Sequence, residues 1–246
     1  MSETLRIQRH DTHVTATLDR PEKRNAIDQD LVDALHALCE ALEDEPRTLI
    51  LTGAGGTFAA GADIAQLRER RAADARAGIN TRCFERIRRL PMPVIAVIDG
   101  YALGGGAELA YAADIRIGTP SLKIGNPETG LGIIAAAGAT WRLREIVGEP
   151  LAAEILLTGR VLDADEALAA GLVTRVAEPT EAMAEAEGIT RRIAALDPAA
   201  TQATKRALLA PREAHPDIDL EEQAVLFESP EKERRMTAFL ERKKAR

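Results

Sequence analysis

The chain has 246 residues, a length that fits one sizeable domain or one domain with a helical appendage. Its net charge of −7 and its aromatic content of 3% argue against a broad nucleic-acid-binding face and against a stacking platform for single strands. Residues 1–10 are polar, and no run reaches the roughly 20 apolar residues of a membrane span, so we expect a cytoplasmic protein without nucleic-acid or membrane partners.

Short apolar or alternating segments predict strands in the first part of the chain, and the first two of them predict a hairpin. Asp28 is the expected N-cap of a helix in which leucines recur at spacings of three and four. A second helical stretch, rich in Arg and Glu, is predicted over residues 64–90. The predicted strands cover residues 4–8, 14–18, 48–52, 93–98, 114–118 and 173–176.

The pattern beyond residue 180 is helical, and prolines separate the helices because proline stops a helix. The predicted helices cover residues 180–196, 199–209, 217–227 and 231–244. The chain is therefore predicted to consist of an α/β core over residues 1–178 and a helical C-terminal region over residues 179–246.

Residues 48–63 and 93–108 share one order of features: strand, glycine, loop, small residues, acidic residue and helix. Small residues let a ligand approach the main chain, and the first N–H groups of a helix have no partner within it. Two such helix starts that converge would direct two donors at one oxygen atom and form an oxyanion hole. The alternative is that the glycines only make tight turns.

Two carboxyl side chains accompany these glycines. Glu108 falls in the first turn of the second glycine-rich helix, and Glu128 falls in a turn stiffened by Pro127 and Gly130. Two carboxyl groups in one site can divide their roles into a base and a proton donor, because burial and mutual charge raise the pKa of one of them. Taken singly, Glu108 is also a common helix N-terminal acid and Glu128 a common solvated turn residue.

Motifs of other enzyme classes are missing from the sequence. There is no P-loop, no complete G-x-G-x-x-G fingerprint and no G-x-S-x-G nucleophile elbow. His36 and Cys39 supply only two potential ligands, so no metal site is predicted. Cys39 and Cys83 fall in predicted helices and are interpreted as free thiols of a reducing compartment.

Arg20, Lys23 and Arg24 follow the second predicted strand. They form either a solvated turn or a small cationic cradle for a phosphate group.

Six segments follow one another over nearly the whole chain: LDRPEKRNAID (18–28), LTGAGGTFAAGADI (51–64), PVIAVIDGYALGGGAELAYAADIRIG (93–118), IGNPETGLG (124–132), LTGRVLDADEALAAGLVTRV (157–176) and FESPEKERRMTAFLERKKA (227–245). Together, and in this order, they resemble the enoyl-CoA hydratase/isomerase (crotonase) family. The resemblance implies an α/β fold, a crotonase-like spiral of ββα units with a helical C-terminal trimerisation region, assembled as a homotrimer or homohexamer.

The resemblance also implies roles for individual residues. The backbone N–H groups of Ala62 and Gly105 would form the oxyanion hole, and Glu108 and Glu128 would be the catalytic glutamates. The residues implied to bind coenzyme A and the acyl group are Arg24, Ala26, Ala60, Gly61, Asp63, Ile64, Phe239 and Lys243.

The activity that the resemblance implies is hydration of a trans-2-enoyl-CoA, with an acyl-CoA thioester as substrate and no separate cofactor or metal. The family hosts several reactions on one fold, so a Δ3-Δ2-enoyl-CoA isomerase, another crotonase-type enzyme and a non-catalytic scaffold are the alternatives. The presence of both Glu108 and Glu128 favours the hydratase.

The sequence departs from the family pattern after Leu131-Gly132, where the family usually reads Pro-Gly-x-Gly-Gly. Here residues 135–139 read Ala-Ala-Ala-Gly-Ala, and Trp141 stands where the family has a smaller residue. The departure leaves the preferred acyl chain open.

Overall fold

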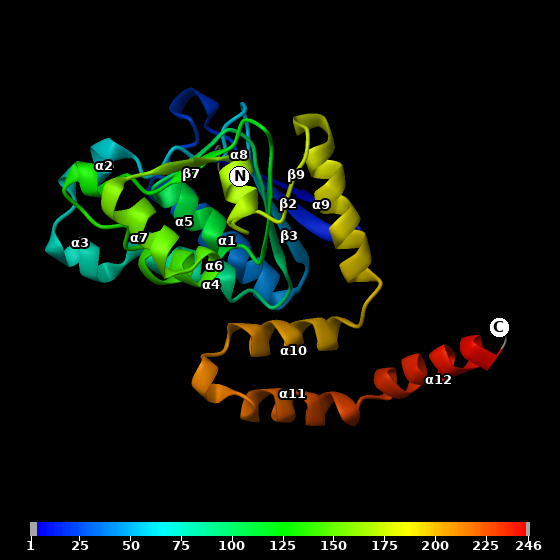
Figure 1. Cartoon of the computed structure of the whole chain (residues 1–246). Coiled ribbons are helices and arrows are strands. Elements are labelled where there is room, and N and C mark those ends of the chain that lie inside the picture. Colours follow the sequence, from blue (N-terminus) through cyan, green and yellow to red (C-terminus); the bar gives the residue numbers. More distant parts are fainter. Residues whose placement is uncertain (1–3, 245–246) are drawn as a thin grey trace. The chain divides into compact units, whose positions relative to one another are not determined.

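The computed structural model describes residues 4–244 of the chain (Figure 1). The chain forms two compact units, which divide between Thr190 and Arg191. The larger unit contains every strand of the described chain and is an α/β fold, as predicted, and the smaller unit is helical.

Two sheets form the larger unit. The first has the strand order β1-β2-β3-β4-β6-β9, and the second has the order β5-β7-β8. The strands β1 and β2 form the predicted antiparallel hairpin, whereas the remaining neighbours in the first sheet are parallel. The bounds are β1 (Leu5–Arg9), β2 (His13–Leu18), β3 (Thr48–Gly53), β4 (Val94–Ile98), β5 (Tyr101–Leu103), β6 (Ile115–Gly118), β7 (Lys123–Gly125), β8 (Val161–Asp163) and β9 (Arg175–Val176).

The central strands are buried because helices cover parallel sheets, and their sequences are correspondingly apolar rather than alternating. All five residues of β4, which reads VIAVI, are buried. The helix α1 (Gln29–Asp44) packs against α4 (Ile79–Arg88), and α4 packs against α5 (Gly105–Ala112). Asp28 caps α1 as predicted, because its side chain accepts a hydrogen bond from Leu31 N.

The stretch 64–90 is three helices rather than one: α2 (Ile64–Glu69), α3 (Ala72–Ala77) and α4. The extended residues Arg70 and Arg71 separate α2 from α3. Gly78, with φ of 64°, adopts the left-handed conformation that ends α3. The strands β5, β7 and β8 were not predicted, because a strand of three residues is too short to show alternation.

The remaining helices of the larger unit come after β7 in the chain. They are α6 (Arg144–Val147) and α7 (Glu149–Thr158), which precede β8, and α8 (Ala164–Ala169) and α9 (Pro179–Ala194), the last of which crosses the boundary between the units. Short 3-10 helices lie at Pro21–Lys23 and Glu128–Leu131, and a π-helix lies at Ala139–Leu143.

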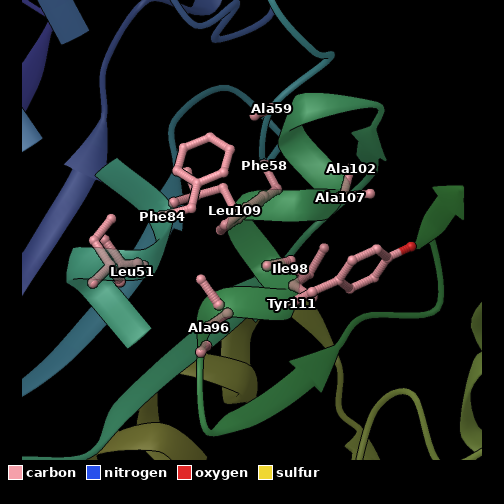
Figure 2. Close-up of a cluster of buried hydrophobic side chains, with 14 of the residues drawn as sticks. Leu51, Phe58, Ala59, Phe84, Ala96, Ile98, Ala102, Ala107, Leu109 and Tyr111 are labelled. Carbon is pink, nitrogen blue, oxygen red and sulfur yellow. The ribbon is translucent and has the colours of Figure 1, made fainter. Parts of the chain in front are cut away.

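Aromatic and aliphatic side chains from both glycine-rich units meet in one buried cluster (Figure 2). Phe58 precedes α2, and Leu109 and Tyr111 come from α5; all three are fully buried. The ring of Tyr111 belongs to this cluster while its hydroxyl oxygen points out of it (Figure 2). The core therefore holds the two similar segments, residues 48–63 and 93–108, in place relative to each other.

The smaller unit contains α10 (Pro198–Leu209), a 3-10 helix (Arg212–Ala214), α11 (Asp217–Phe227) and α12 (Pro230–Lys244). Within residues 4–244, no helix is both long enough and apolar enough to cross a bilayer.

Candidate active site

A cavity of about 530 Å³ lies in the larger unit. We call it the main cavity. Its walls come from α2, α3, the starts of α4 and α5, and the segment from Pro127 to Ala137. Its volume is within the range of small-molecule sites. Seven of the predicted site residues line it: Ala60, Gly61, Ala62, Ile64, Gly105, Glu108 and Glu128.

Close backbone contacts join the two glycine-rich segments. Ala59 and Ala102 form a parallel bridge in which Leu103 N donates to Ala59 O at 3.0 Å. Gly106 permits this approach, because a Cβ on Gly106 would lie 2.0 Å from Ala59 O. The starts of α2 and α5 are therefore held side by side by contacts that only glycine allows.

Ala62 and Gly105 meet at this junction. A Cβ placed on Gly105 would lie 3.5 Å from Ala62 N. Gly105 is the first residue of α5, so its N–H has no partner within the helix. Ala62 pairs with Ile27 through a bridge that uses the neighbouring groups, Gly61 O and Asp63 N. Among residues 4–244, neither Ala62 N nor Gly105 N donates a hydrogen bond, so two amide donors are available to a ligand of the main cavity.

Glu108 lies one turn into α5 and is 4% exposed. Its Oε1 accepts hydrogen bonds from Ala137 N at 2.6 Å and from Ala139 N at 3.2 Å. Burial raises the pKa of Glu108 to about 7; the charge of Glu128 adds to this increase, and the two amide bonds oppose it. Glu108 can therefore exchange a proton near neutral pH.

Glu128 begins the 3-10 helix Glu128–Leu131, lines the main cavity and is 8% exposed. Burial also raises the pKa of Glu128. Its Oε1 accepts a hydrogen bond of 3.4 Å from Asn126 Nδ2, whereas its Oε2 is buried and has no partner among the described residues. One carboxylate oxygen thus remains for a ligand or water.

Asn126 and Tyr111 orient this glutamate, and neither was among the predicted site residues. The Tyr111 hydroxyl donates to Asn126 Oδ1 at 3.0 Å, which fixes the direction of the Asn126 amide. Burial raises the pKa of Tyr111, so the hydroxyl keeps its proton and its role as donor. The only signal in the sequence was an asparagine next to the Pro127-Glu128 turn.

The segment that departs from the family pattern both supports Glu108 and lines the main cavity, through Ala136 and Ala137. It supplies both backbone N–H groups that bond to Glu108. Gly138, which lies between them, has φ of 138°, a backbone conformation that residues with a side chain rarely adopt. Trp141 does not line the main cavity. Its ring packs under the Arg88 guanidinium, 4.9 Å from the ring centroid.

Other predicted residues lie elsewhere. Arg24, Ala26 and Asp63 do not line the main cavity, although Arg24 O accepts from Ala60 N and so holds its wall. The Asp63 side chain caps α2 by accepting from Ala65 N and Gln66 N. Phe239 and Lys243 lie on α12, in the smaller unit, and both are exposed.

Arg20 is not part of an exposed cationic cradle. It is buried, pairs with Asp28 at 2.5 Å and donates to Ala26 O. Lys23 and Arg24 are the exposed cations of that turn.

Cys39 and Cys83 are free and buried, and burial raises the pKa of each thiol to about 12. Residues 4–244 contain no group of three or more His, Cys, Asp and Glu side chains arranged to hold a metal ion.

The larger unit is an α/β fold whose main cavity brings together two backbone N–H groups without a partner among the described residues and two buried carboxyl groups. The chain belongs to the enoyl-CoA hydratase/isomerase family, whose model matches residues 9–246.

Individual relatives match nearly the whole chain. A short-chain-enoyl-CoA hydratase from Clostridium acetobutylicum is 38% identical and covers 93% of this chain and 91% of its own. A crotonyl-CoA hydratase from Syntrophomonas wolfei is 35% identical, and the match covers 99% of this chain and 97% of that protein. The crystal structure of an enoyl-CoA hydratase from Bacillus anthracis superposes with a TM-score of 0.91 at 30% identity. The superposition covers 97% of this chain and 96% of the other.

Proposed function

We propose that this protein adds water across the double bond of a trans-2-enoyl-CoA and produces a 3-hydroxyacyl-CoA. The observation that supports this function is the meeting of two unpartnered backbone N–H groups and two buried carboxyl groups in one cavity. The names of the relatives from Clostridium acetobutylicum and Syntrophomonas wolfei agree with it.

Hydration moves negative charge onto the thioester oxygen. When water adds to C3, the electrons of the double bond shift through C2 to that oxygen. The N–H groups of Ala62 and Gly105 would stabilise this charge, and a single donor of this kind contributes about 3 kcal/mol in other enzymes. A saturated or unconjugated acyl chain offers no such electron shift.

The two glutamates would divide the proton transfers. Glu108, whose pKa lies near neutrality, takes a proton from the attacking water as its oxygen bonds to C3. Glu128, whose pKa is also raised, gives a proton to C2 as the thioester carbonyl re-forms. One water is consumed, and a proton passed from Glu108 back to Glu128 restores the starting state.

The substrate brings its own coenzyme A, so the proposed reaction needs no separate cofactor. Ala60, Gly61 and Ile64 would border the acyl and pantetheine path, with Arg24, Ala26 and Asp63 around it. Phe239 and Lys243 would hold the nucleotide end within a homotrimer or homohexamer, across a subunit boundary.

The test is the loss of enoyl-thioester absorbance when purified protein and crotonyl-CoA are mixed. We expect a rapid, protein-dependent loss and formation of 3-hydroxybutyryl-CoA. Conversion of a 3-enoyl-CoA is measured alongside. Isomerisation without hydration would replace the hydratase by the isomerase, and absence of binding to any coenzyme A ester would end the proposal.

A further inference from the structure

The side chain of Asn80 lies in the main cavity without a hydrogen bond to any described residue. Asn80 is the second residue of α4, and it lines the cavity. Its Oδ1 is buried and has no partner within residues 4–244. Oδ1 can only accept, so a water molecule or a ligand N–H would pair with it. Nδ2 can donate, and it is the atom that can pair with a ligand oxygen.

The Asn80 amide lies beside the two backbone donors. A Cβ placed on Gly105 would lie 3.6 Å from Asn80 Nδ2 and 3.5 Å from Ala62 N. Asn80 Nδ2, Ala62 N and Gly105 therefore surround the same small volume. This volume adjoins the place where the two N–H groups would receive a thioester oxygen.

The other lining residues of this wall do not pair with the Asn80 carboxamide. Ile79, Leu103 and Ile133 are apolar lining residues. Thr81, the neighbouring polar residue of α4, already donates its hydroxyl hydrogen to Ala136 O at 3.1 Å. Asn80 is thus the side chain of this wall whose polar atoms remain available.

We infer that the Asn80 carboxamide is a third hydrogen-bond donor to the thioester carbonyl oxygen, beside the N–H groups of Ala62 and Gly105. This inference rests on the proposed function and adds a side-chain donor to an oxyanion hole otherwise formed by backbone N–H groups. Asn80 transfers no proton. Its Nδ2–H bond to the oxygen strengthens as negative charge forms there, because hydrogen bonds to charged acceptors are the stronger ones.

Three variants test the inference. Asn80→Leu removes the donor at similar size. Asn80→Asp keeps the shape but directs an acceptor at the forming oxyanion. Arg82→Leu is the matched control, since Arg82 is exposed on the same helix and lies outside the main cavity. We expect kcat for crotonyl-CoA to fall about 10- to 100-fold in Asn80→Leu, at least as far in Asn80→Asp, and less than twofold in Arg82→Leu.

Ligand binding separates this role from a packing role. Butyryl-CoA, which develops no charge, should bind each variant within about threefold of wild type. Acetoacetyl-CoA should lose its bound enolate absorbance in the near ultraviolet in both Asn80 variants. Circular dichroism checks folding, and if Asn80→Leu fails to fold, the isosteric Asn80→Asp decides the result.

The outcomes are distinguishable. Wild-type hydratase activity that persists in Asn80→Leu or Asn80→Asp would overturn the Asn80 role alone. An equal loss of butyryl-CoA binding and turnover would also overturn it, in favour of a packing role. Wild-type protein that does not hydrate enoyl thioesters overturns the proposed function and, with it, the role of Asn80.

Discussion

Burial and hydrogen bonding act in opposite directions on the carboxyl group of Glu108. Burial favours the neutral acid, while the N–H groups of Ala137 and Ala139 favour the carboxylate. Burial dominates, and the pKa rises to about 7. A base that must take a proton from water and later return it works best when its pKa is close to the ambient pH.

Removal of either carboxyl group should stop most of the reaction. We expect Glu108→Gln and Glu128→Gln each to lower kcat by about 100-fold or more, the usual scale for acid–base groups. Steady-state kinetics with crotonyl-CoA measure this effect. Glu149→Gln, at an exposed position of α7, is the control and should retain activity. Full turnover in either active-site variant would contradict the assigned roles.

The raised pKa of Glu108 also predicts how stability depends on pH. The folded protein holds this proton up to about pH 7, whereas the unfolded chain releases it near the ordinary value of 4.5. In that window the native state binds more protons, so the free energy of unfolding falls as pH rises from about 4.5 to 7. The contribution is on the order of 3 kcal/mol.

Glu108→Gln should remove this dependence. Urea denaturation of both proteins at pH 5 and pH 8 measures it. We expect the variant to lose less stability than the wild type between these two values. Equal losses in both proteins would show that Glu108 titrates at its ordinary pKa.

At the scale of elements, the sequence predicted the helices and strands that have a long, regular pattern of apolar residues or a clear cap. The leucines of α1, the cap at Asp28 and the β1-β2 hairpin are local features, and all three are confirmed. The break at Gly78 depends on a left-handed backbone that a helical composition conceals. The bonds from Ala137 and Ala139 to Glu108, and from Tyr111 to Asn126, join residues far apart in sequence, so no local pattern could predict them.

Two neighbouring glycines of α5 should respond differently to the same substitution. A Cβ on Gly106 would lie 2.0 Å from Ala59 O, so Gly106→Ala must separate the two glycine-rich segments and should destabilise the fold strongly. A Cβ on Gly105 makes ordinary contacts, the nearest at 3.5 Å from Ala62 N. Gly105→Ala should therefore fold normally and lose activity, because its methyl group would crowd the thioester oxygen.

Thermal melts and crotonyl-CoA turnover of the two variants test this contrast. We expect a large drop in Tm only for Gly106→Ala, and loss of turnover at unchanged Tm for Gly105→Ala. An active Gly105→Ala enzyme would mean that the thioester oxygen binds elsewhere.

At the scale of the whole molecule, the smaller unit exposes many large apolar side chains. Val225 is 72% exposed and Phe227 52% exposed on α11, and Met236 and Leu240 are exposed on α12. Apolar side chains gathered on consecutive helices are typical of surfaces that bind another protein chain. Their number is consistent with the proposed homotrimer or homohexamer, in which identical chains would cover them.

Light scattering of the purified chain should therefore give a mass of three or six subunits. Val225→Asp should shift this mass towards the monomer, because a carboxylate buried in an apolar interface loses its hydration without gaining a partner. Glu221→Gln, which alters a charge on the same helix, is the control and should leave the mass unchanged. A monomeric wild-type protein would contradict the assembly, and Phe239 and Lys243 would then lose their proposed role across a subunit boundary.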